Sequence, residues 1–215
     1  MSIPLDGSSA GRVAIVTGGS RGVGRATVRL LAARGYAVAV NYLHDQRAAE
    51  SAVEAILAGQ GAAMTVRADV ADDLDVQRLF AETIAAFGGV DVVVHAVASP
   101  VTSSSVAEVD LDVFDALVRI STRAAIIVNR EAARHVRNGG AIVNLTSSPD
   151  NLTPTAYRRY AAARAATHAL TRALAVELRG RDITVNAVCI EAGAPCAPNR
   201  VADVVACLIG GHGRA

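Results

Sequence analysis

The sequence contains no lysine and no tryptophan, and aromatic residues make up only 3% of its 215 residues. All 21 basic residues are therefore arginines, and 20 acidic residues bring the formal net charge to +1. This balance indicates neither a nucleic-acid partner nor attraction to an anionic membrane surface. Apolar runs long enough to cross a bilayer are absent, as is the pattern of a secretory signal in residues 1–11. We therefore expect a cytoplasmic protein with no membrane association.

Cysteine is also scarce, since the chain has only Cys189, Cys196 and Cys207. Their odd number and the lack of a C-x-x-C spacing argue against a disulfide framework or a zinc site, and we expect reduced thiols and no metal. With 52% hydrophobic residues, the chain is too apolar to be mainly disordered. A core with so few aromatic side chains must consist of Ala, Val, Leu and Ile, which suits parallel strands covered by helices.

Short apolar segments alternate along the chain with longer segments of helical period. We expect strands at 12–17, 36–41, 62–68, 91–95, 141–146 and 183–188, and helices at 22–34, 46–57, 73–87, 111–136, 155–178 and 199–209. Because each helix returns the chain to the same edge of the sheet, the strands should be parallel. The predicted fold class is α/β: a single-domain, Rossmann-like, doubly wound sheet of about six strands, in the order 3-2-1-4-5-6, with helices on both faces. Residues 1–215 would form this one domain, with a flexible N-terminus at 1–10 and a shortened C-terminal region at 190–215.

A glycine-rich turn, TGGSRGVG at residues 17–24, follows the first expected strand and leads into the first expected helix. Glycines allow the backbone to approach a diphosphate closely, and the free N–H groups at the start of the helix can then bind it. Three glycines are weak evidence in isolation, because an ordinary strand-to-helix turn also uses them. Their place after the first strand of an alternating chain favours dinucleotide binding.

The end of the second expected strand favours NADP(H) over NAD. An acidic residue there would bind the ribose hydroxyls of NAD and repel a 2′-phosphate, but the strand ends with Asn41 and Tyr42. Arg21, inside the glycine turn, supplies a cation for that phosphate. The alternative is that Arg21 is only a solvated surface charge, and the nearby His44 and Asp45 leave NAD open.

The chain resembles the short-chain dehydrogenase/reductase family, in particular its beta-ketoacyl-acyl-carrier-protein reductase type, over residues 10–190. The turn matches T-G-x-x-x-G-x-G, Asp69-Val70 resembles the pair that contacts adenine, and residues 140–188 resemble the catalytic segment and the strand after it. The resemblance implies NADP(H)-dependent hydride transfer between nicotinamide and a small-molecule carbonyl or alcohol. It also implies that the cofactor is bound by Gly18, Ser20, Arg21, Gly22, Val23, Gly24, Asn41, Asp69, Val70, Ala96, Tyr160 and Arg164.

The catalytic roles carried over from the family fall on residues at matching spacing. Tyr160 would act as general acid or base, and Ser147 would hold the substrate oxygen. A phenol with its ordinary pKa of about 10 is a poor base at neutral pH unless a nearby cation favours its anion. Tyr157 is a competitor on the same segment, but Ala161, four residues later, supplies no cation.

Four departures from the family pattern predict weakened catalysis. Arg164 stands at the position of the catalytic Lys and keeps a positive charge, but it does not release a proton. Ser121 replaces the Asn of the proton relay and has a shorter reach. Ala98 replaces a glycine beside the cofactor, and Ile190-Glu191 replaces Pro-Gly after the sixth strand, where the loop that covers the substrate is shortened.

Two functions therefore remain open at this point: an NADP(H)-dependent reductase with low activity, or an NADP-binding subunit or regulatory protein without catalysis. In either case we expect no nucleic acid and no membrane as partner. Apolar stripes on helices 111–136 and 155–178 predict a homodimer through those helices, as in the family. The alternative is that the stripes only face the sheet.

Overall fold

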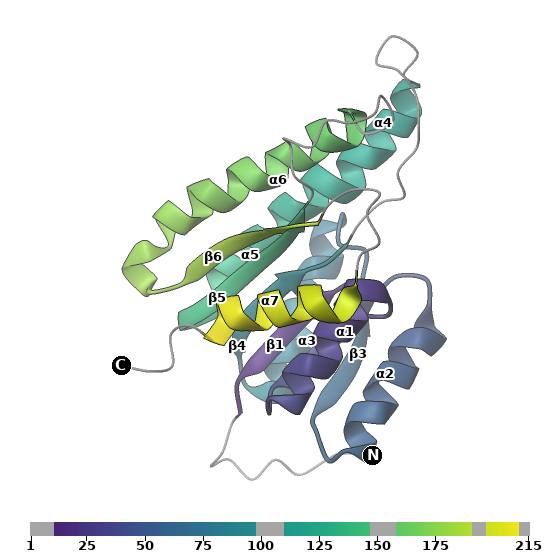
Figure 1. The fold of residues 1–215 in the computed structure, drawn as a ribbon, viewed down its shortest axis with the longest axis vertical. Coiled ribbons are helices and arrows are strands. Elements are labelled where there is room, and N and C mark those ends of the chain that lie inside the picture. The colour runs from purple at the N-terminus through teal and green to yellow at the C-terminus, as the bar shows by residue number, and fades with distance from the viewer. Residues whose placement is uncertain (1–10, 98–109, 147–157, 191–196, 211–215) are drawn as a thin grey trace.

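Six parallel strands form one sheet in the order β3-β2-β1-β4-β5-β6. The computed structural model describes residues 11–97, 110–146, 158–190 and 197–210 (Figure 1). The strands are β1 (Val13–Thr17), β2 (Ala37–Tyr42), β3 (Ala63–Arg67), β4 (Val90–His95), β5 (Val136–Thr146) and β6 (Thr184–Cys189). The helices are α1 (Gly22–Ala33), α2 (Gln46–Ala58), α3 (Asp73–Phe87), α4 (Leu111–Val118), the π-helical η2 (Arg119–Arg123), α5 (Ala124–His135), α6 (Arg158–Glu177), the 3-10 turn η4 (Arg179–Arg181) and α7 (Pro198–Gly210). The predicted fold class and strand order are confirmed.

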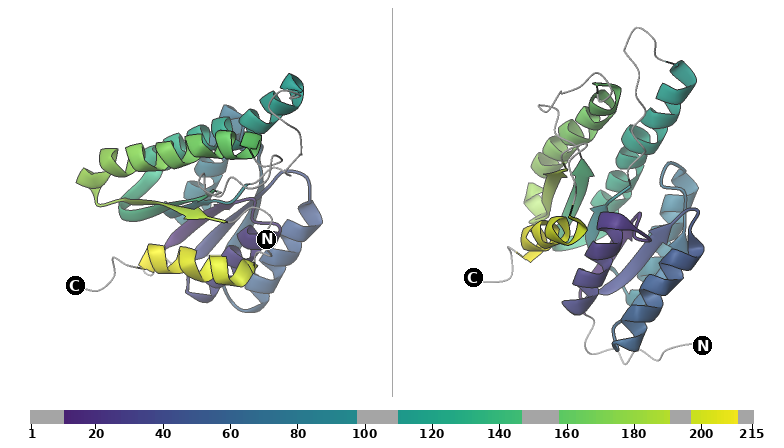
Figure 2. Two further views of the ribbon diagram at one scale, coloured as in Figure 1. Left: turned by 45° about the horizontal axis from the view of Figure 1, so that its top comes forward. Right: turned by 45° about the vertical axis from the view of Figure 1, so that its right-hand side comes forward.

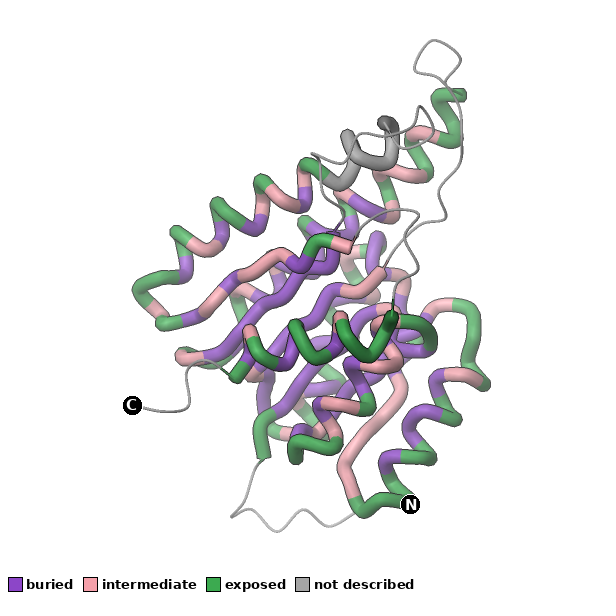
Figure 3. Tube along the Cα trace, in the orientation of Figure 1, coloured by how far each residue is buried: buried purple, intermediate pink, exposed green. Residues whose placement is uncertain are grey.

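Helices cover both faces of the sheet, with α1, α2 and α7 on one face and α3, α5 and α6 on the other (Figures 1 and 2). Each face has its own apolar core. Val28 and Leu31 of α1 pack on the first face, and Phe80 of α3 and Val128 of α5 on the second. The central strands β1, β2 and β4 are buried along most of their length, whereas the edge strands β3 and β6 are mostly of intermediate burial (Figure 3). Burial on both faces explains why these central strands are nearly continuous runs of Val, Ile and Ala.

The expectation of one continuous helix at 111–136 is wrong, because the π-helical turn η2 divides it. The end of the helix at His135 lies one residue before the expected end. Val136 is extended, with φ −64° and ψ 129°, and it already pairs with Val90 as the first residue of β5. The register then shifts between Val90 and Val92, and Gly139 within this irregularity has φ +75°. The Asn-Gly-Gly sequence therefore marks a bulge inside β5, where glycine supplies the positive φ.

The fifth strand begins five residues before its expected start at residue 141, because β5 includes the irregular residues from Val136 onward. The other elements lie within one or two residues of their expected bounds where the structure describes them, which is the usual uncertainty of helix and strand ends. Residues 155–157 of the expected sixth helix and the expected flexible N-terminus at 1–10 lie outside the described residues. No helix in the described ranges combines the length and the apolar character needed to span a membrane.

Candidate functional site

The glycine turn lies at the carboxyl end of β1, where it brings the start of α1 against the backbone of the strand. A Cβ atom added to Gly24 would overlap the carbonyl oxygen of Gly18. Gly18 itself has φ +64°, and a Cβ there would lie 3.2 Å from the carbonyl oxygen of Ala96, which follows β4. Side chains at these two positions would therefore force α1 and the end of β4 away from the turn. This close packing is the arrangement that a diphosphate site requires.

The N-cap residue of α1 does not cap the helix with its side chain. This residue, Arg21, is extended, with φ −149° and ψ 170°, makes no side-chain capping bond and is exposed, and the first turn contains no acidic residue. By contrast, the side chains of Asp45, Asp72 and Asp110 accept backbone hydrogen bonds at the starts of α2, α3 and α4. The positive end of the α1 dipole and its N–H groups therefore fit an external anion, such as the diphosphate of a dinucleotide.

Two more of the expected cofactor residues form part of the same turn. Ser20 is buried, with 8% of its surface exposed, and Val23 packs against the apolar core around α1. Gly22 has φ +55°, which a glycine adopts without strain. The structure thus brings the six expected residues of the turn together at one end of the sheet.

Asn41, expected to contact the cofactor, is only 2% exposed and binds backbone groups. Its Oδ1 accepts a hydrogen bond from the N–H of Gly18 at 3.3 Å, and its Nδ2 donates to the carbonyl of Ala68 at 2.9 Å. The N–H of Gly19 also donates to the carbonyl of Asn41 at 3.0 Å. Asn41 thereby links the ends of β1, β2 and β3 and holds the glycine turn in place.

The expected adenine pair lies in the loop after β3. Val70 is buried, whereas the side chain of Asp69 keeps 21% of its surface exposed. The Asp69 carboxylate accepts from the N–H of Ala71 at 2.9 Å and forms an ion pair with Nη2 of Arg119 at 2.8 Å. Sequence reasoning missed Arg119, because it lies 50 residues away and no local pattern distinguishes it from the other arginines.

Ala96 is held next to the turn by a polar pair at the ends of β1 and β4. Oγ1 of Thr17 and Nδ1 of His95 lie 2.9 Å apart, and the N–H of Ala96 donates to the same Thr17 oxygen at 3.2 Å. His95 is 1% exposed and therefore forms part of the core between these strands. Within the described ranges, no group of three His, Cys, Asp or Glu side chains is placed to hold a metal ion.

The expected catalytic residues are described to different extents. Ser121 lies in η2, is 3% exposed, and its hydroxyl donates to the carbonyl of Leu117 at 2.5 Å. Positions 160 and 164 belong to helix α6, four residues apart, but their side chains lie outside the described part of the structure. Ser147 and Ala98 also lie outside it. The π-helical geometry at Ser121 is a feature frequent at functional sites, and the sequence carries no signal for it.

A buried polar network connects the elements that lead to these positions. Asn129 of α5 and Asn144 of β5 exchange two side-chain hydrogen bonds of 2.8 and 3.0 Å. Asn144 also donates to Oγ1 of Thr171 in α6 at 3.1 Å. All three side chains are buried. The sequence offered one sign of this network, which is the amide of Asn144 within an otherwise apolar strand. Satisfied buried networks of this kind fix one arrangement of the elements they join.

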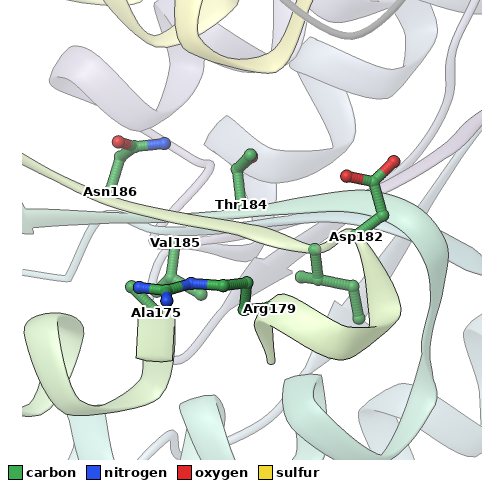
Figure 4. A pocket seen from close by; sticks show the side chains of 7 residues that line it. Ala175, Arg179, Asp182, Thr184, Val185 and Asn186 are labelled. Carbon is green, nitrogen blue, oxygen red and sulfur yellow. The ribbon is translucent and has the colours of Figure 1, made fainter. Parts of the chain in front are cut away.

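A pocket of about 280 Å³ lies away from the glycine turn, at the amino end of β6. Arg179, Asp182, Thr184 and Asn186 contribute to its lining, and Figure 4 shows Thr184 and Asn186 on one side of the strand and Val185 on the other. In a doubly wound sheet, ligands bind at the carboxyl ends of the strands. This pocket is therefore an edge feature of β6 and not part of the candidate site.

Comparisons with known proteins agree with this geometry. Residues 18–204 match the family model described as Enoyl-(Acyl carrier protein) reductase. Versicolorin reductase 1 of Aspergillus parasiticus is 39% identical over 180 residues, which cover 83% of this chain and 68% of that protein. The chloroplastic NADPH-dependent aldehyde reductase 2 of Arabidopsis thaliana is 38% identical over 194 residues, covering 83% and 71%. A short chain dehydrogenase from Burkholderia cenocepacia, solved in complex with NADP, superposes with a TM-score of 0.85 at 33% identity, covering 96% of this chain and 93% of that one.

Proposed function

Because the chain belongs to the short-chain dehydrogenase/reductase family, as an NADP(H)-dependent oxidoreductase, we propose that it reduces a small-molecule carbonyl compound, or oxidises the corresponding alcohol. The observation that carries the proposal is the glycine turn against the uncapped start of α1. NADPH, when bound, supplies a hydride to the carbonyl carbon. The N–H groups at the start of α1 would hold its diphosphate, and Arg21 its 2′-phosphate. Asp69 and Val70 would bind the adenine, and Ala96 would lie beside the turn.

We propose that Tyr160 donates a proton to the carbonyl oxygen while Ser147 donates a hydrogen bond to the same atom. A fixed cation near a phenol favours its anion, and Arg164 would supply that charge while also binding the cofactor ribose. Arginine stays protonated near neutral pH, so Arg164 would not itself return a proton to Tyr160, and other groups would do so. Ser121, whose own proton is donated to the helix backbone, would accept a hydrogen bond in that relay.

We also propose a homodimer formed through α4, α5 and α6. Leu111, Val113 and Ile126 on the first two helices and Val176 on α6 are large apolar side chains that are between 40% and 67% exposed. Full burial of one such side chain at an interface would stabilise the dimer by about 1.5–3 kcal/mol. Sedimentation should give a dimer, and Ile126→Asp should shift it toward the 22.0 kDa monomer. A wild-type monomer at micromolar concentration would contradict the dimer.

The proposed location is the cytoplasm, with reduced thiols. Of the three cysteines, Cys207 is described as an exposed, free thiol, whereas Cys196 lies outside the described residues. Labelling with a membrane-impermeant maleimide before and after lysis tests the location, because a cytoplasmic thiol is protected until the cells are opened.

The function is tested by calorimetric titration with NADPH and NADH, followed by a carbonyl screen that measures loss of NADPH absorbance. We expect preference for NADPH, and Arg21→Gln should reduce that preference. Tyr160→Phe should lower turnover at least about 100-fold, because general acid catalysis contributes about that much, and it should weaken NADPH binding by a much smaller factor. Arg164→Lys alone should change the rate little, since Ser121 also limits the relay.

Two outcomes would contradict the proposal. Failure of the wild-type chain to bind either nucleotide would remove the cofactor site. Tight NADPH binding with no turnover of any carbonyl or alcohol, in a screen where a family reductase is active, would instead indicate a binding protein without catalysis.

A further inference from the structure

We infer that Arg119 is a positioning residue for the adenine end of the cofactor and that it acts through the carboxylate of Asp69. The inference rests on the proposed function, because it takes Asp69 and Val70 as the adenine-binding pair. The two side chains come from distant elements, since Asp69 follows β3 and Arg119 opens the π-helical turn η2.

The Asp69 carboxylate is fixed by protein donors on both oxygens. Oδ1 accepts from the N–H of Ala71 at 2.9 Å, and Oδ2 accepts from Nη2 of Arg119 at 2.8 Å. The main chain is held as well, because the N–H of Asp69 donates to Oδ2 of Asp75 at 2.8 Å. A carboxylate has about four acceptor positions, so acceptor capacity remains on the 21% of the side chain that is exposed.

This arrangement suits the exocyclic amino group of adenine, which donates hydrogen bonds and is bound more strongly by a charged, oriented acceptor. The Arg119 guanidinium is always charged and keeps one carboxylate oxygen turned toward η2. The remaining acceptor positions are then oriented before any ligand arrives, which reduces the ordering that binding requires. Without Arg119, Oδ2 would lose its protein partner, and the N–H of Ala71 on Oδ1 would be left to orient the carboxylate.

A second arginine strengthens the attachment of η2 to the same loop. Nε of Arg123 donates to the carbonyl of Ala71 at 3.1 Å. Arg119 and Arg123 therefore fasten the segment that carries Ser121 to the loop after β3. Among the described residues, Arg123 donates to this backbone oxygen and not to the Asp69 carboxylate, so its loss should loosen the loop without changing which atoms of Asp69 can accept.

The test measures binding of NADPH and of its hypoxanthine analogue, in which an oxo group replaces the adenine amino group. Titrations use the full chain as wild type, Arg119→Gln, Asp69→Asn and the double variant. Arg137→Gln is the matched control, because Arg137, with 44% of its side chain exposed, pairs with Asp91 at 3.4 Å at the opposite end of the strands. All variants are compared by thermal unfolding, so a misfolded protein is recognised.

We expect Arg119→Gln to weaken NADPH binding about two- to fivefold, the range of partly exposed ion pairs. Preference for adenine over hypoxanthine should fall by a similar factor, whereas Arg137→Gln should change neither quantity. In the Asp69→Asn background, Arg119→Gln should have no further effect beyond that of the control, because the partner through which it acts is gone.

Three results would overturn the inference. Arg119→Gln could leave both NADPH affinity and base preference unchanged, or it could weaken NADPH equally with and without the Asp69 carboxylate, which would indicate general charge attraction. A wild-type chain that binds no dinucleotide would overturn the proposed function together with this inference, whereas the first two results leave the proposed function standing.

Discussion

The start of α1 and the starts of α2, α3 and α4 solve the same problem in opposite ways. Every α-helix begins with N–H groups that have no partner inside the helix. In α2, α3 and α4 an aspartate side chain accepts hydrogen bonds from them, but α1 begins with an exposed arginine that makes no capping bond. The difference indicates that the starts of α2, α3 and α4 serve the fold alone, whereas the start of α1 is available to a ligand.

The missing cap has a cost that the rest of α1 offsets. A side-chain cap contributes about 0.5–2 kcal/mol, and α1 forgoes it. The helix instead buries Val28 and Leu31 completely and packs along α7 (Figure 2). Stability from packing thus leaves the first turn of α1 free to serve an anion.

The largest effect is expected where the α1 start meets the strand. Gly24→Ala would place a Cβ atom into the carbonyl oxygen of Gly18, and backbone atoms there have no room to shift. We expect a loss of about 3 kcal/mol in unfolding free energy and no measurable NADPH binding. Urea unfolding and calorimetric titration measure the two quantities.

Gly180→Ala is the matched control, since a Cβ at that position has nothing within 4 Å. It should unfold and bind NADPH as the wild type does. A Gly24→Ala protein with wild-type stability and affinity would mean that α1 does not approach the turn as closely as the structure has it.

A smaller effect is expected from giving α1 the kind of cap that the other helices have. Arg21→Asp puts an acceptor at an N-cap residue whose backbone is already extended. We expect the ligand-free protein to gain about 0.5–1 kcal/mol of stability, while NADPH affinity falls more than about tenfold. Stability of the free protein should therefore rise while NADPH affinity falls, and thermal unfolding with and without NADPH measures both changes.

Arg21→Gln separates the two causes, because it removes the cation without adding an acceptor carboxylate. It should weaken NADPH binding without stabilising the free protein. If Arg21→Asp lowered stability and left affinity unchanged, the uncapped start would have no connection with ligand binding.

A third experiment removes a cap that serves the fold. The Asp72 side chain accepts from the N–H of Asp75 at 3.0 Å at the start of α3. Asp72→Ala should cost about 1 kcal/mol of unfolding free energy, whereas Arg21→Ala should cost none. Equal losses in urea unfolding would remove the distinction between the two kinds of helix end.

The contrast between helix ends also shows what could be predicted from the sequence. The glycine turn and the six strands followed from alternation and spacing, because these depend on neighbouring residues. The strand order followed from the doubly wound fold class that the alternation indicated. The orientation of Asn41 did not, because a strand end does not reveal whether an amide faces a ligand or the backbone of two neighbouring strands. The ion pair of Arg119 with Asp69 joins residues 50 apart, and its existence depends on how η2 packs against the β3 loop.

The break in the long helix was missed for a related reason. Residues 119–123 have no glycine or proline that would mark a change of helical geometry. The π-helical turn follows from packing, as η2 is fastened to the loop after β3 by the side chains of Arg119 and Arg123. Local propensity is a weak guide where tertiary contacts decide.

The smallest expected effect concerns the acidic first turn of α3, which α1 lacks. The pKa of Asp75 lies below its ordinary value of 3.8, because the N–H of Asp69 donates to its carboxylate and the Arg78 guanidinium lies 2.7 Å away. A lowered pKa means that this carboxylate stabilises the folded state above the unfolded value, and that the contribution is lost as pH falls through the folded value. Asp75→Asn should therefore reduce stability by less than about 1 kcal/mol at neutral pH, and the difference should vanish in acid. Urea unfolding measured from neutral pH down to acid tests this expectation, with Glu54→Gln, a change at an exposed position of α2, as the control. A loss of stability that grew as the pH fell would contradict the predicted direction.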